Sequence, residues 1–174
     1  HMVDDALAAI AAARAAGVPL SEAARGVGEA RGSRWRMQVA DVGDMRILND
    51  AYNANPASMA AALKALVVMG KGRPTWAVLG YMAELGDAEL EEHDRIGRLV
   101  VRLGIKHLIT VGEKARAIHE AARLEGLFGG EAHFARDVDE AARVLREHVQ
   151  HDAVVLIKAS RAAGLERIAE ELEA

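Results

Sequence analysis

The fold is decided by a turn from a strand into a helix, encoded by Asn49-Asp50-Ala51-Tyr52-Asn53-Ala54-Asn55-Pro56-Ala57-Ser58-Met59. The mostly apolar segment 45–48 reads as a short strand, and the Ala- and Leu-rich segment 58–69 reads as a helix. Pro56 suits the first helical turn, where its missing N–H would have no partner anyway. Asn55 can cap the helix from the preceding position.

Helix-start chemistry does not account for Asp50, Tyr52 and Asn53, which stand on the same turn. In a parallel α/β sheet such a turn lies at the carboxyl ends of the strands, where ligands bind. Because Asp50 follows the strand and stands outside any core run, we expect its removal to leave the sheet intact.

Outward from this turn, strand and helix patterns alternate along the chain. The predicted strands are 37–42, 46–49, 76–79, 107–111, 133–135 and 153–158. The predicted helices are 58–69, 90–103, 113–124, 138–148 and 162–172. This alternation indicates a parallel sheet covered on both faces. We therefore predict an α/β domain: a three-layer, Rossmann-like, mostly parallel sheet flanked by helices, preceded by a short helical segment.

Composition excludes several classes of protein. The 174 residues suffice for one ordinary domain, and 51% are apolar with few aromatics, which favours helix-covered sheets. The net charge of −4 does not indicate the basic surface that binds nucleic acids. Without cysteine there is neither a disulfide framework nor a thiolate site, which fits a reducing cytoplasm. No apolar run approaches the length of a membrane span.

The first 34 residues read as a separate piece. His1-Met2 is typical of an expression-tag scar, and no signal peptide follows it. A helix over 4–16 ends at Gly17, and a shorter helix begins near Pro19. Both helices carry few large apolar groups, so we expect an appendage or the tail of a preceding domain. The domain boundary is predicted between residues 34 and 35.

Two further loops follow predicted strands. In loop 80–86 two glycines bracket a turn that contains Glu84. After the last strand come Lys158, Ser160 and Arg161, where the final helix is expected to begin, and free N–H groups there would favour an anion. Arg161 could grip a carboxylate through two parallel hydrogen bonds. Alternatively, Ser160 caps the helix and the two cations face water.

Other polar motifs predict little chemistry. His93 reads as a solvated helix residue, and the other chain histidines show no metal-ligand spacing, so we read them as structural. Segment 70–73 (Gly-Lys-Gly-Arg) follows a helix and precedes a strand, which is the reverse of a phosphate loop. The first predicted strand is not followed by the glycine fingerprint of dinucleotide binding.

Taken together, four motifs resemble the C-terminal domain of the Mur ligases, most closely those members that add D-Ala-D-Ala to UDP-N-acetylmuramoyl-tripeptide in peptidoglycan synthesis. They are 49–59, 79–86, His93 with Ile96-Gly97, and 155–166, in family order and with family spacing. The resemblance covers residue 35 to the C-terminus. It implies that 1–34 holds the tag scar and the last helices of a central ATP-binding domain.

The resemblance implies an ATP-dependent cytoplasmic amide ligase whose partners are ATP, D-Ala-D-Ala and UDP-MurNAc-tripeptide. Its ATP-binding residues would be Arg36, Asp50, Asn53 and Asn55, with Arg34 as a rival for the role of Arg36. Its dipeptide-binding residues would be Lys158, Ser160 and Arg161. The phosphate loop and the Mg²⁺ ligands belong to the central domain, so this chain alone should be inactive and hold no catalytic or metal-binding residue.

Two departures from the family pattern stand out. Tyr81 occupies a position where the family usually has an acid, so no role carries over to it. Ala159 replaces a glycine, and its methyl group could narrow the approach of the backbone to substrate. Competing interpretations are a folylpolyglutamate synthase-type ligase domain, which the 52–56 run disfavours, and a non-catalytic Rossmann-like binding module.

Overall fold

The structure is a computed structural model that describes residues 2–30, 33–127 and 131–173. It divides into two units, residues 1–33 and 34–174. The first unit contains helices α1 (Met2–Ala15) and α2 (Leu20–Glu29), which pack against each other. Gly17, with φ of +89°, adopts a left-handed conformation that follows α1, as the predicted helix stop requires.

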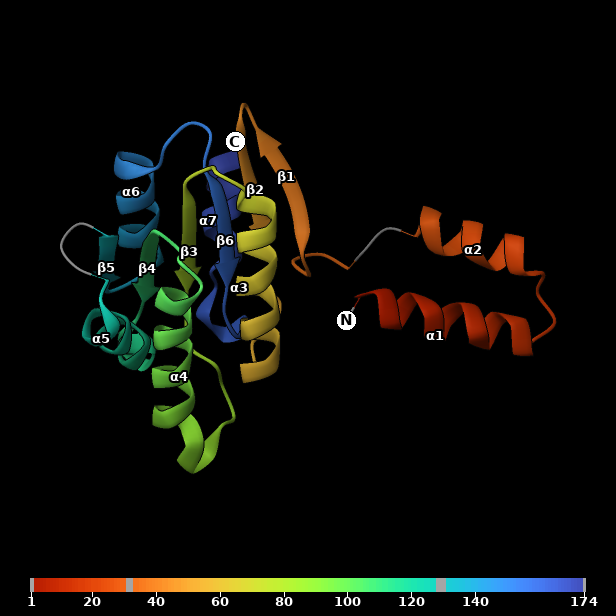
Figure 1. Ribbon diagram of the computed structural model, residues 1–174, viewed down its shortest axis with the longest axis horizontal. Helices are drawn as coiled ribbons and strands as arrows, with labels where there is room; N and C mark the ends of the chain where they lie inside the picture. Colours follow the sequence, from red (N-terminus) through yellow and green to blue (C-terminus); the bar gives the residue numbers. More distant parts are fainter. Residues whose placement is uncertain (1, 31–32, 128–130, 174) are drawn as a thin grey trace. The chain divides into compact units, whose positions relative to one another are not determined.

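The second unit is built on a six-stranded sheet with the order β1-β2-β6-β3-β4-β5 (Figure 1). The strands are β1 (Gln38–Val42), β2 (Met45–Asn49), β3 (Thr75–Leu79), β4 (His107–Val111), β5 (Ala132–Ala135) and β6 (Val154–Lys158). Only the β1–β2 hairpin at one edge is antiparallel; the other four pairings are parallel. The mostly parallel sheet is as predicted.

Helices cover both faces of the sheet. They are α3 (Pro56–Gly70), α4 (Glu89–Arg102), α5 (Arg116–Glu125), α6 (Val138–His148) and α7 (Glu166–Glu173). One core cluster joins the sheet to α3, α4 and α5, and the other joins it to α6 and α7 (Figure 1). Every residue of β3 and β6 is buried, because these strands lie in the middle of the three layers. The predicted α/β class is confirmed.

The end of the chain differs from the prediction. Instead of one helix over 162–172, a short 3₁₀ turn (η4, Arg161–Ala163) is followed by Gly164 in the left-handed region, and α7 then starts at Glu166. Ser160 makes no side-chain cap to that turn. The expectation that Ser160 and Arg161 open the final α-helix is therefore wrong, and so is the capping alternative for Ser160.

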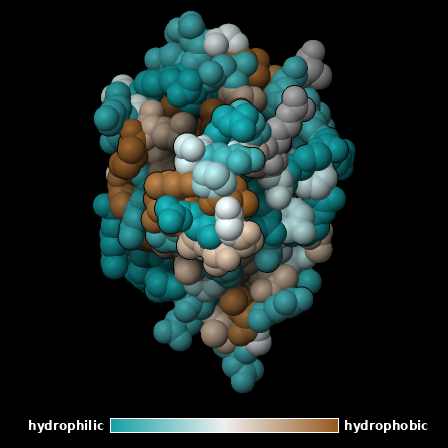
Figure 2. All heavy atoms as spheres, turned by 90° about the vertical axis from the view of Figure 1, so that its right-hand side faces the viewer, coloured by the Kyte–Doolittle hydropathy of each residue, from teal (hydrophilic) through white to brown (hydrophobic). Residues whose placement is uncertain are grey.

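The surface combines hydrophilic side chains with some exposed apolar ones, among them Val68, Leu90 and Leu124. Hydrophilic side chains predominate on the face drawn in Figure 2, and apolar ones occupy smaller areas. Within the described residues, no helix has both the length and the apolar character that crossing a bilayer requires.

Candidate functional site

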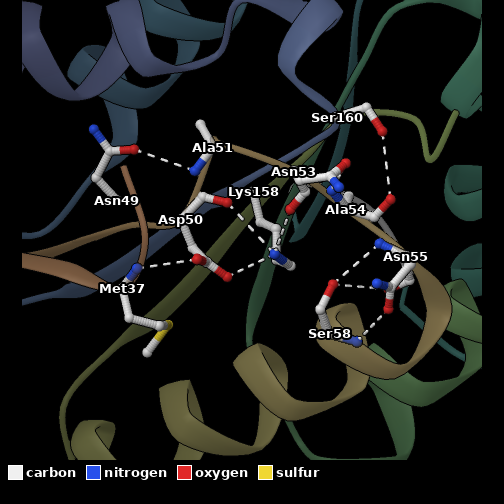
Figure 3. A network of polar contacts seen from close by, with 10 residues as sticks. All are labelled: Met37, Asn49, Asp50, Ala51, Asn53, Ala54, Asn55, Ser58, Lys158 and Ser160. Atoms are coloured by element: carbon white, nitrogen blue, oxygen red, sulfur yellow. Dashed lines mark hydrogen bonds and ion pairs between the residues drawn. The ribbon is translucent and has the colours of Figure 1, made fainter. Parts of the chain in front are cut away.

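The sheet brings two predicted motifs to one edge. β2 and β6 are parallel neighbours, with Asn49 opposite Ile157, so both strands end at the same level. The Asp50 N–H donates to the Ile157 carbonyl at 2.9 Å and continues the ladder one residue beyond β2. The turn after β2 and the turn after β6 therefore lie side by side at the carboxyl edge (Figure 3).

A buried ion pair joins these two turns. The Lys158 Nζ donates to Asp50 Oδ2 at 2.6 Å and to the Asn53 carbonyl at 2.8 Å, with a longer contact of 3.4 Å to the Asp50 carbonyl. The three donors of the ammonium thus have three oxygen partners (Figure 3). The Lys158 side chain is 2% exposed and that of Asp50 14%.

Burial lowers the pKa of Lys158 from the usual lysine value, although the pairing with Asp50 opposes this shift and the nearby Arg36 adds to it. The second Asp50 oxygen accepts from the Met37 N–H at 3.0 Å. Asp50 is thus a structural partner as well as a candidate ligand. This pairing argues against the expectation that loss of Asp50 leaves the sheet intact, since Lys158 would keep a buried charge without its counter-ion.

Ser160 and Ala159 hold the loop that follows β3. Ser160 is buried, its hydroxyl accepts from the Ala83 N–H at 2.8 Å, and its N–H donates to the Tyr81 carbonyl at 3.0 Å. The methyl group of Ala159 is also buried, and a side chain on Gly80 would come within 2.7 Å of it. It therefore fills space beneath the loop, and its burial gives no support to the expectation that it narrows the approach to substrate.

The asparagines of the turn shape the backbone. Asn55 and Ser58 form a reciprocal capping box at the start of α3, with distances of 2.8 and 3.0 Å (Figure 3). The Asn53 side-chain oxygen accepts from the Ala54 N–H at 2.8 Å. Asn53 and Asn55 are nevertheless exposed on the turn. Their amides can meet a ligand only with the groups that these bonds leave free.

The two candidate arginines near the start of the domain have different surroundings. The Arg36 guanidinium lies 4.3 Å from the centre of the Tyr52 ring, so it stands on the turn that carries Asp50. Arg34 lies over Trp35 and pairs with Glu170 on α7 at 3.6 Å. This placement favours Arg36 over Arg34 as the cation of the turn.

Arg161 stands beside an open groove at the same edge. The groove has a volume of about 610 Å³ and is lined by Tyr52, Asn53, Ala54, Asn55, Ala83, Glu84, Leu85, Ser160, Arg161 and Ala162. The Arg161 side chain is 51% exposed and pairs loosely with Glu166 at 3.7 Å. Glu84, exposed at the groove, holds a left-handed φ of +62°, which is uncommon for a residue with a side chain.

His93 is not solvated as predicted. It is 1% exposed, its Nε2 accepts from the Met82 N–H at 2.8 Å, and its Nδ1 lies 2.6 Å from the Glu89 carbonyl. The imidazole therefore ties α4 to the loop after β3. Within the described ranges, no group of three or more His, Asp or Glu side chains is arranged to hold a metal ion.

Residues 35–161 match the family described as "Mur ligase, glutamate ligase domain", and the chain belongs to that family. The relatives include the UDP-N-acetylmuramoyl-tripeptide–D-alanyl-D-alanine ligase of Mycobacterium tuberculosis, 45% identical across 100% of this chain and 38% of that protein. This chain therefore spans well under half the length of the curated relatives it matches.

Solved structures give the same assignment. The MurF structure from Acinetobacter baumannii superposes with a TM-score of 0.85 at 31% identity, covering 97% of this chain and 36% of that one. The MurF ligase of Thermotoga maritima, in complex with ADP, gives 0.73 at 25% identity, covering 94% and 36%. The resemblance read from the four motifs is confirmed.

Proposed function

We propose that this chain is the C-terminal domain of a cytoplasmic, ATP-dependent ligase that joins D-Ala-D-Ala to UDP-MurNAc-tripeptide in peptidoglycan synthesis. The observation that carries the proposal is the 45% identity, over the whole of this chain, to a ligase of that name. The gathering of the strand-end motifs on one edge, around a groove, supports it. The first unit is proposed to be the end of the central domain.

In this reaction ATP converts the tripeptide carboxylate into an acyl phosphate, and the dipeptide amine displaces phosphate to form the amide. Catalysis requires close positioning of these groups and clamps for their negative charge. The domain would supply cations for the two anionic ligands, the nucleotide and the dipeptide carboxylate. Arg36 and Arg161 are suited to this, since both are exposed and arginine binds phosphate and carboxylate in a bidentate manner.

On the nucleotide side we assign Arg36 to phosphate, and Asp50, Asn53 and Asn55 to the nucleoside. The Asp50 oxygens already accept from Lys158 and Met37, so its remaining lone pairs suit a ribose hydroxyl better than direct metal ligation. The site does not fit Mg²⁺ as a resident ion, and we assign that ion to the rest of the longer ligase.

On the dipeptide side Arg161 would bind the carboxylate. Lys158 and Ser160 would act indirectly, because both side chains are buried and already hydrogen-bonded to the turns that they support. Their proposed role is to fix the shape of the groove rather than to touch the ligand through their side chains.

The test is steady-state kinetics of Arg161→Ala in the full-length ligase, with each substrate varied separately. A charge-assisted hydrogen bond contributes about 1.5–3 kcal/mol, so the KM for D-Ala-D-Ala should rise by roughly ten- to a hundred-fold while that for ATP stays unchanged. Arg167→Ala, which removes an exposed arginine paired with Asp139, is the matched control.

Three outcomes would contradict the proposal. A rise in the KM for ATP alone would mean that the two ligands are assigned the wrong way round. A wild-type full-length protein that binds neither ATP nor D-Ala-D-Ala in isothermal titration would indicate a non-catalytic module. Phosphate release by this chain alone, dependent on D-Ala-D-Ala, would contradict its expected inactivity.

A further inference from the structure

The segment that opens the domain has an unusual backbone. Trp35 and Met37 hold left-handed φ values of +58° and +47°, which residues with side chains rarely adopt. Two hydrogen bonds hold this conformation: the Tyr52 N–H donates to the Trp35 carbonyl at 3.0 Å, and the Met37 N–H donates to Asp50 at 3.0 Å. The segment is thereby fastened to the turn after β2.

This backbone places the Trp35 ring against Arg161. The Arg161 Cζ lies 3.8 Å from the centre of the half-buried ring, closer than Arg34 at 4.9 Å. A guanidinium over an indole face is attracted by the ring quadrupole. Among the described residues, Arg161 forms an ion pair with Glu166 at 3.7 Å, a separation too long for a good hydrogen bond. The indole face therefore packs directly against the Arg161 guanidinium, whereas the contact with Glu166 is a loose ion pair.

We propose that Trp35 is a positioning residue that holds Arg161 ready for the carboxylate of the incoming dipeptide. The inference rests on the proposed function, in which Arg161 binds that carboxylate. An arginine side chain has several rotatable bonds, and ordering it when the ligand binds costs free energy. A ring stacked on the flat face restricts those rotations beforehand, yet leaves the N–H edges free to form two parallel bonds with a carboxylate.

Trp35 has a second consequence for the site through its sequence neighbour. Arg36 lies over Tyr52, so one short segment carries the nucleotide cation and positions the dipeptide cation. A variant at Trp35 must therefore be read against both substrates. Leucine and phenylalanine are the informative replacements, because both keep apolar bulk and the same left-handed backbone cost, whereas only phenylalanine keeps a π face.

The kinetic experiment compares Trp35→Leu, Trp35→Phe and Arg161→Ala in the full-length ligase. Loss of an exposed cation–π contact corresponds to about a two- to five-fold change. We expect Trp35→Leu to raise the KM for D-Ala-D-Ala by that factor with kcat and the KM for ATP unchanged, and Trp35→Phe to stay near wild type. In the Arg161→Ala background, Trp35→Leu should add nothing. Arg34→Ala, which removes the cation farther from the ring, should have no effect.

A direct measurement on this chain checks the contact itself. In a ¹H–¹⁵N spectrum the Arg161 Nε–H resonance should be displaced upfield by the ring current in the wild type and in Trp35→Phe, and should return to its usual position in Trp35→Leu. An undisplaced resonance in the wild type overturns the proposal.

The kinetics also separate this proposal from the one on which it rests. If Arg161→Ala leaves the KM for D-Ala-D-Ala unchanged, the assignment of Arg161 fails, and the role of Trp35 fails with it. If Arg161→Ala raises that KM while Trp35→Leu does not, only the positioning role is wrong. Equal losses in Trp35→Leu and Trp35→Phe would also overturn it, because the π face would then be irrelevant.

Discussion

Asp50→Asn should destabilise the domain strongly, because it leaves the Lys158 ammonium buried without a counter-ion. The substitution keeps the size of the side chain and removes only its charge. Breaking a buried ion pair by removing one partner typically costs about 3–5 kcal/mol. Domains of this kind are stable by about 5–15 kcal/mol, so the loss would be a large fraction of the total.

Deprotonation of Lys158 limits how much stability the variant can lose. The variant can avoid the buried charge by releasing the proton of Lys158, which at pH 7 costs about 1.36 kcal/mol for each unit below the usual lysine pKa of about 10.4, or roughly 4.6 kcal/mol. The predicted penalty at neutral pH therefore lies between about 3 and 4.6 kcal/mol. At pH 9 the same ceiling falls to about 1.9 kcal/mol.

The sign of the pH dependence follows from the direction of the pKa shift. Burial already lowers the pKa of Lys158 in the folded wild type, and removing Asp50 takes away the charge that opposes this shift. The unfolded chain then binds more protons than the folded variant below the usual lysine pKa, so the stability of the variant rises with pH. The gap between wild type and Asp50→Asn should be widest at neutral pH and shrink as pH approaches 10.

The assay is urea unfolding followed by tryptophan fluorescence. Both tryptophans of the chain, Trp35 and Trp76, lie in the larger unit, so the signal reports its unfolding. With a slope of about 2 kcal/mol/M, the midpoint of Asp50→Asn should fall by roughly 1.5–2.3 M at pH 7. Asp41→Asn is the matched control, since it removes an exposed carboxylate paired with Arg46 and should leave the unfolding midpoint almost unchanged.

A double variant tests the cause. Adding Lys158→Met to Asp50→Asn removes the orphaned charge, and replacing a buried pair by apolar groups is often nearly neutral, so stability should recover in part. A loss below about 1 kcal/mol for Asp50→Asn, or no recovery in the double variant, would refute the reasoning that the pair is dry and charged.

Two further substitutions test the packing of α4 against α5 and the capping of α3. Gly97→Ala should cost about 1–3 kcal/mol in urea unfolding, because an added methyl group would clash with the Ile118 carbonyl oxygen and push α4 away from α5; an unchanged midpoint would contradict this close packing. Asn55→Ala should cost about 1 kcal/mol by removing the cap of α3, and a thermal midpoint equal to that of wild type would mean that the cap contributes nothing.

Local signals predicted the elements well. The segment 154–157 is a continuous apolar run, 107–111 is mostly apolar, and the helix over 138–148 has clear amphipathic spacing. The structure has β6, β4 and α6 there within a residue of the predicted bounds 153–158, 107–111 and 138–148. Such patterns record burial along the chain and need no knowledge of which strands are neighbours. The alternation of these patterns along the chain also predicts the α/β class.

Contacts between residues far apart in the chain cannot be predicted from such local patterns. Lys158 and Asp50 stand 108 residues apart, and only the placement of β6 beside β2 brings them together. The sequence therefore placed them in two different sites as separate ligands. No local pattern predicts the contact between Trp35 and Arg161 either, since these residues are even farther apart in the sequence.

The burial of His93, by contrast, had a local signal. His93 precedes Ile96, Gly97 and Val100 at helical spacings of three, four and seven residues, and all four lie buried on the same face of α4. The neighbouring acids Glu91 and Glu92 favour the prediction that His93 faces water. That prediction rests on local composition and disregards the helical spacing. A polar residue that falls on an apolar stripe predicts a buried, hydrogen-bonded group more reliably than its sequence neighbours do.

The carboxyl edge of this sheet carries two kinds of cation with different physical roles. All three N–H groups of Lys158 contact oxygen atoms of Asp50 and Asn53. In this arrangement its charge holds the two turns together, and no N–H group remains free for a ligand. Arg36 and Arg161 are instead held by aromatic faces, which restrict the guanidinium without occupying its N–H edges. The proposed role in binding two anions would use both kinds: a buried pair that fixes the two turns, and exposed cations restrained by contacts that leave their N–H groups free.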